Sequence, residues 1–114
     1  MLKKSIRLTK IKDFKNIYKN GKIKHSNLFK VILLKNNLII NRYGIVVSNK
    51  VSKKAIERNK IKRQIKHILQ KNKAKINQGF DIIIVTYSAI KQVPYKEVES
   101  SLAFLFYKLF LLKK

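Results

Sequence analysis

Residues 80–86 read Phe80-Asp81-Ile82-Ile83-Ile84-Val85-Thr86, a short and almost wholly apolar run that begins directly after Gly79. A strand with one face in water alternates apolar and polar side chains, whereas a strand covered on both faces is apolar nearly throughout. The run is also short for a helix and rich in β-branched residues. We therefore expect a strand at the centre of a sheet, with other elements packed on both of its faces.

Amphipathic helices are expected around this strand. Thr9 is a suitable N-cap for a short first helix that Gly21 would end in a left-handed conformation, and Ser52 is a suitable N-cap for a second helix. Pro94 suits the first turn of a last helix. The second helix has an apolar stripe at helical spacing, formed by Ile61, Ile65, Ile68 and Leu69. The last helix has a similar stripe, formed by Tyr95, Val98, Leu102, Leu105, Leu109 and Leu112.

Strand-forming residues fill the segment between the first two helices. Residues 28–34 and 38–48 are separated by Lys35-Asn36-Asn37, which favours a hairpin between antiparallel strands, and residues 23–27 are expected to add a short edge strand. The element order is then α-β-β-β-α-β-α. This order predicts an α+β fold, an α/β two-layer sandwich with helices covering a small mixed sheet. Its length makes residues 1–114 a single domain.

The charge of the chain is extreme for its length. Lys and Arg number 28 against only 5 Asp and Glu, which gives a formal net charge of +23. So many positive charges repel one another, and they favour a polyanionic partner. The five carboxylates are too scattered for a two-metal nuclease, and the absence of cysteine excludes thiolate zinc sites and cysteine nucleophiles. We therefore expect no catalytic residue, no side-chain metal site and no cofactor bound by the protein itself.

No segment resembles a signal peptide or a membrane span. The most apolar stretch, residues 102–112, is interrupted by Lys108 and is far shorter than the roughly 20 residues that cross a bilayer. We expect a soluble protein of the cytoplasm that makes no membrane contact.

The second helix carries a cationic stripe opposite its apolar one, formed by Asn59, Lys62, Arg63 and Lys66. Basic residues opposite an apolar stripe are common on ordinary solvated helices, which is the alternative interpretation. Such helices usually alternate acids with their lysines, yet Glu57 is the only acid between residues 51 and 79. Additional donors at residues 48–54 precede the helix N-terminus, where backbone N–H groups favour phosphate. The pattern therefore indicates RNA or DNA contact.

The segment 42–63 resembles the signature block of the bacterial ribonuclease P protein component. It reads RYGIVVSNKVSKKAIERNKIKR and fits the family pattern, R-x-G followed by V-S-x-K and an R-N-x-x-K-R helix, without a gap. The resemblance continues upstream to Arg7-Leu8 and Asp13-Phe14. Downstream it reaches Asp81-Ile82-Ile83-Ile84 and the last helix, so it spans essentially the whole chain.

The resemblance implies an accessory subunit of a ribonucleoprotein endonuclease that removes the 5′ leader of precursor tRNA. Hydrolysis would belong to the catalytic RNA and its Mg²⁺. It also implies an unusual left-handed β-α-β crossover and a cleft between the first helix and the sheet that holds the leader. The residues implied to bind the catalytic RNA are Lys50, Lys53, Lys54, Arg58, Asn59, Lys60, Lys62, Arg63 and Lys66. The residues implied to bind the leader are Phe14, Tyr18 and Phe29.

Three places depart from the family pattern, one of them Lys66-His67, which stands where Arg-Glu is common. Lys60 replaces an Arg and so lacks its planar fork, and Asn49 stands where a basic residue is usual. Composition by itself also fits a different class, a structural RNA-binding protein such as a small ribosomal protein. The RNA that copurifies would distinguish the two classes.

Overall fold

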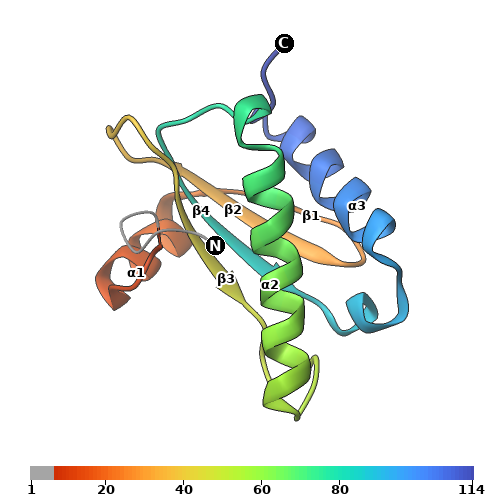
Figure 1. Ribbon diagram of the computed structural model, residues 1–114. Helices are drawn as coiled ribbons and strands as arrows, with labels where there is room; N and C mark the ends of the chain where they lie inside the picture. The colour runs from red at the N-terminus through yellow and green to blue at the C-terminus, as the bar shows by residue number, and fades with distance from the viewer. Residues whose placement is uncertain (1–6) are drawn as a thin grey trace.

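The computed structural model describes residues 7–114. A four-stranded sheet in the order β1-β2-β4-β3 has α1 on one face and α2 and α3 on the other (Figure 1). The fold is the predicted α/β sandwich with a mixed sheet. The helices are α1 (Ile11–Asn20), α2 (Ala55–Lys71) and α3 (Tyr95–Lys108), and the strands are β1 (Lys22–His25), β2 (Phe29–Lys35), β3 (Arg42–Val46) and β4 (Phe80–Thr86). Short 3-10 turns span Lys73–Lys75 and Ser88–Gln92.

Strand β4 occupies the centre of the sheet, as its apolar sequence predicts. It pairs antiparallel with β2 and parallel with β3. The predicted hairpin around Lys35-Asn36-Asn37 is wrong. Strand β4 lies between β2 and β3 and pairs with both, so β2 and β3 do not pair with each other. The expected edge strand is present as β1, which pairs antiparallel with β2.

Successive side chains along each strand point to opposite faces of the sheet, so the core has two layers. On the α2 and α3 side, Phe29 and Ile84 belong to a large cluster of buried residues that includes Ile65 of α2 and Leu102 of α3. The other side is thinner and holds a small cluster formed by Leu8, Ile17, Ile32 and Ile83. Because α1 covers only part of this second face, Phe14, Val46 and Val85, which pack against the small cluster, are only partly buried.

Helix α2 connects the parallel neighbours β3 and β4, so β3-α2-β4 is a crossover unit. Turned so that both strands point upward with α2 in front, Figure 1 places β4 to the left of β3. The crossover is therefore left-handed, against the strong general preference for the right-handed form. This hand brings α2 over the β3 edge of the sheet.

Both predicted ends of α1 differ in detail. Its N-cap is Lys10 rather than Thr9, without a side-chain cap, and Gly21 is extended with φ −79° rather than left-handed. Gly21 serves close packing instead: a Cβ there would lie 2.6 Å from the Ile17 carbonyl oxygen and 2.7 Å from Ile32 Cγ2. The glycine thus lets the end of α1 sit directly on β2.

The α2 stripe packs as predicted, and the α3 stripe does so in part. Helix α3 ends at Lys108, before Leu109 and Leu112, and Tyr95 is only partly buried, while Phe106 is buried although the sequence did not place it on the stripe. Ile61, Ile65, Ile68 and Leu69 are buried on α2, and Val98, Leu102, Leu105 and Phe106 are buried on α3. Pro94 is the N-cap residue of α3, one position before the helix. No helix within residues 7–114 is long and apolar enough to cross a bilayer.

Candidate nucleic-acid interface

Helix α2 presents its cationic residues away from the core. Asn59, Lys60 and Arg63 are exposed, and Lys62 and Lys66 are partly covered at one side of the helix. Before the helix, the exposed lysines 50, 53 and 54 extend the same positive surface. The structure therefore places the residues assigned to catalytic-RNA binding on α2 and on the turn before it, from Lys50 to Lys66.

The start of α2 is fixed by a compact set of polar contacts. Ser52 is buried, and its Oγ accepts the N–H of Lys54 at 3.1 Å and donates to Glu57 Oε1 at 2.7 Å. Arg58 Nη1 donates to the Ser52 carbonyl oxygen at 3.0 Å. Ser52 thus anchors the turn before the helix rather than serving as its N-cap, and Arg58 has a structural contact besides any contact with RNA.

The acid in this region, Glu57, is hydrogen-bonded and lies near a lysine. Glu57 accepts the Ser52 hydrogen bond and lies 4.0 Å from Lys91 Nζ. The Ser52 hydrogen bond, together with the positive charge of Lys91, lowers the pKa of Glu57 below its usual value. Glu57 therefore stays ionised, and Lys91 balances part of its charge.

Two of the three aromatic residues assigned to the leader share one surface. Phe14 and Tyr18 lie one turn apart on α1, with Phe14 half-buried and Tyr18 44% exposed. The assignment of Phe29 is wrong, because it is 0% exposed and packs in the core beneath α2 and α3, on the opposite face of the sheet from α1. A ring without accessible surface cannot stack on a base.

A cavity of about 200 Å³ opens at the β3 edge, between α1 and α2. Its walls come from residues 7–9, Phe14, residues 43–45, Lys62 and Lys66. The N–H of Leu8 donates to the Tyr43 carbonyl oxygen at 2.8 Å, so residues 7–9 lie beside β3 and close one wall. The cavity therefore joins the two predicted surfaces: an aromatic ring from the leader set faces the same space as two cations from the α2 set.

Gly44 makes room for the aromatic wall of this cavity. A Cβ at Gly44 would lie 2.7 Å from Phe14 Cζ and 3.5 Å from Leu8 Cβ. Any side chain at this position would displace the Phe14 ring. Gly44 belongs to the R-x-G part of the signature, although the sequence by itself assigned it no role.

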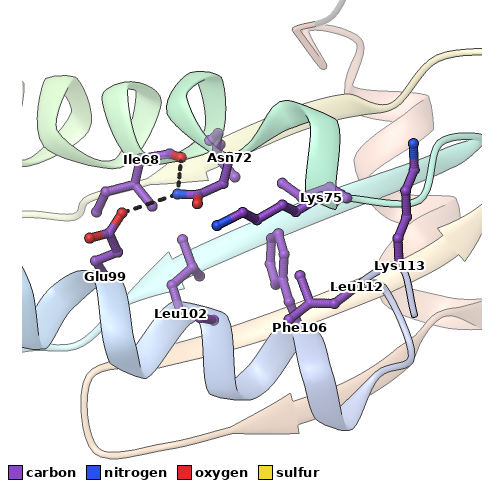
Figure 2. Close-up of a pocket in the computed structure, with 11 residues that line it drawn as sticks. Ile68, Asn72, Lys75, Glu99, Leu102, Phe106, Leu112 and Lys113 are labelled. Carbon is purple, nitrogen blue, oxygen red and sulfur yellow. Dashed lines mark hydrogen bonds between the residues drawn. The ribbon is translucent and has the colours of Figure 1, made fainter.

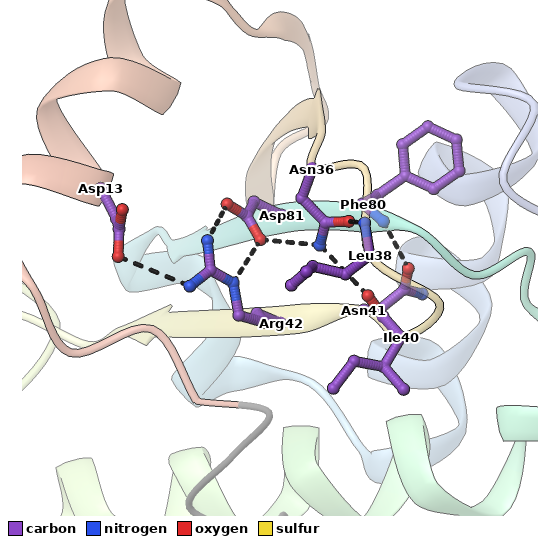
Figure 3. Close-up of polar contacts among 8 residues, drawn as sticks. All are labelled: Asp13, Asn36, Leu38, Ile40, Asn41, Arg42, Phe80 and Asp81. Carbon is purple, nitrogen blue, oxygen red and sulfur yellow. Dashed lines mark hydrogen bonds and ion pairs between the residues drawn. The ribbon is translucent and has the colours of Figure 1, made fainter.

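The position of α1 on the sheet is set by a charged network (Figure 3). Arg42 donates from Nε and Nη2 to the two Asp81 carboxylate oxygens at 2.8 and 2.6 Å, and its Nη1 lies 3.6 Å from Asp13 Oδ2. Asn36 Nδ2 donates to the same Asp81 at 2.9 Å. The Asp81 hydrogen bond raises the pKa of Arg42 further above its usual range. Asp13 precedes Phe14, so this network positions the cleft aromatic.

Most acids of the chain are engaged in the fold. Asp13 and Asp81 bind Arg42, and Glu99 accepts from Asn72 Nδ2 at 3.1 Å and pairs with Lys71 at 3.3 Å. These contacts, the Asn72 hydrogen bond first, lower the pKa of Glu99. Among residues 7–114, no three His, Asp or Glu side chains gather as potential metal ligands.

Comparison with known families gives one consistent match. A family model described as Ribonuclease P matches residues 2–109. The Ribonuclease P protein component of Alkaliphilus oremlandii is 37% identical over 103 residues, which cover 90% of each chain. That of Synechocystis sp. is 42% identical over 85 residues, or 74% of this chain and 68% of the relative.

Solved structures agree with the sequence comparison. The structure of Staphylococcus aureus RNase P protein superposes with a TM-score of 0.88 at 31% identity, covering 96% of this chain and 100% of that chain. The RNase P protein from Thermotoga maritima superposes with a TM-score of 0.79 at 36% identity, covering 87% of this chain and 93% of that one.

Proposed function

Because this chain belongs to the Ribonuclease P protein family, as an accessory subunit of an endoribonuclease of tRNA processing, we propose a specific division of its RNA-binding surface. Its partner is the RNase P RNA, and family membership favours this role over that of a small ribosomal protein. We propose that the outer face of α2 docks on the catalytic RNA and that the cleft beside α1 holds the 5′ leader of precursor tRNA. This assembly would act in the cytoplasm, where precursor tRNA is made.

The α2 face suits a folded RNA because it offers several independent phosphate ligands. Lys60 and Arg63 are exposed on the helix, and Lys53 and Lys54 stand at its N-terminal end, where the free backbone N–H groups add positive potential. Asn59 lies among them with an amide that can both donate and accept, as contact with a 2′-hydroxyl requires.

The cavity at the β3 edge carries the leader proposal. It places the half-buried Phe14 ring and the Lys62 and Lys66 side chains around one space. An aromatic wall can stack on any base, and a lysine pair can neutralise the adjoining phosphates, so a leader of variable sequence would be accepted. Tyr18, one turn further along α1, would supply the next stacking surface.

The protein would take no covalent part in hydrolysis. Asp13, Asp81, Glu57 and Glu99 are engaged by Arg42, Ser52, Asn72 and nearby lysines, which supports leaving the chemistry to the RNA subunit and its Mg²⁺. By neutralising phosphates and holding the leader, the protein would raise substrate affinity and lower the Mg²⁺ concentration that the ribonucleoprotein needs.

Binding of two substrates by the reconstituted holoenzyme tests the leader cleft. We expect Tyr18→Ala to weaken binding of precursor tRNA by roughly tenfold, because one stacked base contributes about 1 to 3 kcal/mol, while binding of leaderless tRNA is unchanged. Tyr18→Phe keeps the ring and should bind like the wild type. Equal losses for both RNAs, or no loss for either, would place the leader elsewhere.

A further inference from the structure

The C-terminal part of α3 exposes aromatic rings that the core does not use. Phe104, Tyr107 and Phe110 are 54%, 66% and 84% exposed, although the neighbouring Leu105 and Phe106 are buried. Scattered exposed apolar residues are normal on a soluble protein, but an aromatic cluster on one surface indicates a binding site. We call Phe104, Tyr107 and Phe110 the C-terminal aromatic surface.

The backbone holds Phe110 outward. Its φ of 60° lies in the left-handed region, which is unfavourable for a bulky residue and needs support from its surroundings. That support comes from the Leu111 N–H, which donates to the Phe106 carbonyl at 2.8 Å, and from Asn77, whose N–H donates to Leu111 O at 2.6 Å and whose Nδ2 donates to Phe110 O at 3.2 Å. The exposed ring is therefore part of an ordered turn rather than of a frayed helix end.

Cations surround these rings. Lys108 Nζ lies 5.4 Å from the centre of the Phe104 ring, within cation–π range. Tyr107 and Phe110 line an open hollow together with Lys108, Lys113 and Lys114, and no acid lines it. The surface thus combines exposed aromatic rings with positive charge.

A second, more apolar pocket of about 300 Å³ adjoins this hollow and shares Leu112 and Lys113 with it (Figure 2). Lys75 reaches across this pocket toward its polar end, where Glu99 lies. Glu99 is paired with Lys71 and hydrogen-bonded by Asn72, so it does not offset the charge of the lysines around the hollow. This adjoining pocket is largely apolar, and Lys75 and Lys113 contribute its positive charge.

We propose that the C-terminal aromatic surface is a further binding site for unpaired RNA. Bases would stack on its three rings while Lys108, Lys113 and Lys114 neutralise the adjoining phosphates. Unpaired RNA fits better than a duplex, whose bases are stacked on one another and present no free face to the rings. A second copy of this chain fits poorly, because each copy carries a formal charge of +23 and would bring its own lysines to the contact.

This site is separate from the α2 face and the α1 cleft. The N-terminal end of α2 and the C-terminal end of α3 lie at opposite ends of the molecule (Figure 1). Helix α2 has 17 residues, so about 25 Å separates its ends. An RNA segment on the C-terminal aromatic surface would therefore be a different one from the segment at Lys53 and Lys54, next to the N-terminal end of α2.

Photocrosslinking of the full-length protein to a single-stranded oligouridine of about ten nucleotides, substituted with 4-thiouridine, tests the proposal. We expect adducts on residues 104–114 in addition to adducts on α1. The variant Phe104→Leu/Tyr107→Leu/Phe110→Leu keeps apolar side chains but removes the ring faces. It should lose adducts on residues 104–114 by about tenfold or more while keeping those on α1. Ile39→Leu, at another exposed apolar residue, is the matched control.

The adducts on α1 keep the two proposals distinguishable, because they report on the leader cleft independently. Adducts on α1 without any on residues 104–114 would overturn the further site alone. Equal competition by an RNA duplex with the same number of phosphates would also overturn it, since stacking would then contribute nothing. A concentration-dependent dimer in sedimentation experiments that the triple variant abolishes would assign the surface to a second copy instead. Repeating the experiment with 4-thiouridine in the catalytic RNA or in precursor tRNA identifies which strand occupies the site.

Discussion

Arg42 and Asp81 form a bidentate ion pair across the parallel strands β3 and β4, with donor–acceptor distances of 2.8 and 2.6 Å. The two residues are register partners, and Asp81 is only 5% exposed. The remaining Arg42 nitrogen lies 3.6 Å from Asp13 on α1. One guanidinium thus links the central strand to the helix that carries the leader aromatics, so the geometry of the cleft depends on a contact outside it.

Substitution of Arg42 should therefore affect both stability and leader binding. We expect Arg42→Ala to lower the free energy of unfolding by about 2 to 3 kcal/mol, because it removes the charged partner of the buried Asp81 carboxylate and leaves the neutral Asn36 amide. Arg42→Lys keeps the charge but not the fork and should cost about 1 kcal/mol. Urea denaturation measures both. The double variant Arg42→Ala/Asp81→Asn should lose less unfolding free energy than Arg42→Ala, because it leaves no unpaired buried charge. A larger loss of unfolding free energy in the double variant would contradict the pairing of Arg42 with Asp81.

A methyl group at Gly44 should damage the cleft more than the fold. The new Cβ would meet the far end of the Phe14 ring at 2.7 Å, and that ring can move away. We expect Gly44→Ala to destabilise the protein by about 1 kcal/mol and to weaken leader-dependent binding of precursor tRNA by roughly tenfold. Gly44→Ala/Phe14→Leu should regain stability without regaining affinity. Wild-type leader affinity in Gly44→Ala would show that the Phe14 ring position does not matter.

The salt dependence of RNA binding should identify the docking face. Log affinity falls as log salt concentration rises, and each lost phosphate contact makes this slope shallower by about 0.7 to 0.9. For binding of the catalytic RNA, Lys60→Ala/Arg63→Ala should therefore make the slope shallower by about 1.4 to 1.8. Lys35→Ala/Lys96→Ala removes the same charge from exposed positions outside α2 and should leave the slope nearly unchanged. Equal effects from the two pairs would mean that charge alone, and not the α2 face, governs binding.

Acid should destabilise the start of α2 through Glu57. The pKa of Glu57 is lowered in the folded protein, chiefly by the Ser52 hydrogen bond and then by Lys91. A lowered folded-state pKa adds stability above the unfolded value of about 4.5, and this stability is lost as pH falls through the folded value. Glu57→Gln should thus reduce the acid-dependent fall of the melting temperature below about pH 4.5. Glu97→Gln, an exposed acid on α3, is the control, and an identical acid profile for wild type and Glu57→Gln would refute the coupling.

Local sequence patterns predicted the helices and strands better than they predicted which strands pair and which residues pack together. The run at residues 80–86 is apolar on both sides in any context, so its central position was predictable. Strands β2 and β3 looked like a hairpin because they are neighbours in the chain, and only the pairing of both with β4 excludes that arrangement. Gly21 likewise resembles a helix stop, while the close approach of Ile17 and Ile32 that requires a glycine exists only in the folded molecule.

The same distinction applies to the candidate site. The cationic stripe of α2 was predictable because helical spacing fixes which residues share a face. The face of Phe29 was not, since residues 28–34 are largely apolar on both sides and do not indicate which side meets α1. The roles of Arg42, Asp81 and Gly44 depend on contacts between residues far apart in sequence, and no local pattern reveals them.

The most direct test of the account is reconstituted cleavage of precursor tRNA at low Mg²⁺, with the RNase P RNA and either wild-type protein or Asn59→Ala/Lys60→Ala/Arg63→Ala. These three residues are exposed on α2, so the variant should fold normally. We expect wild-type protein to restore cleavage, the variant to restore far less, and a higher Mg²⁺ concentration to narrow the difference. Full stimulation by the variant at low Mg²⁺ would contradict the assignment of the α2 face as the docking surface for the catalytic RNA.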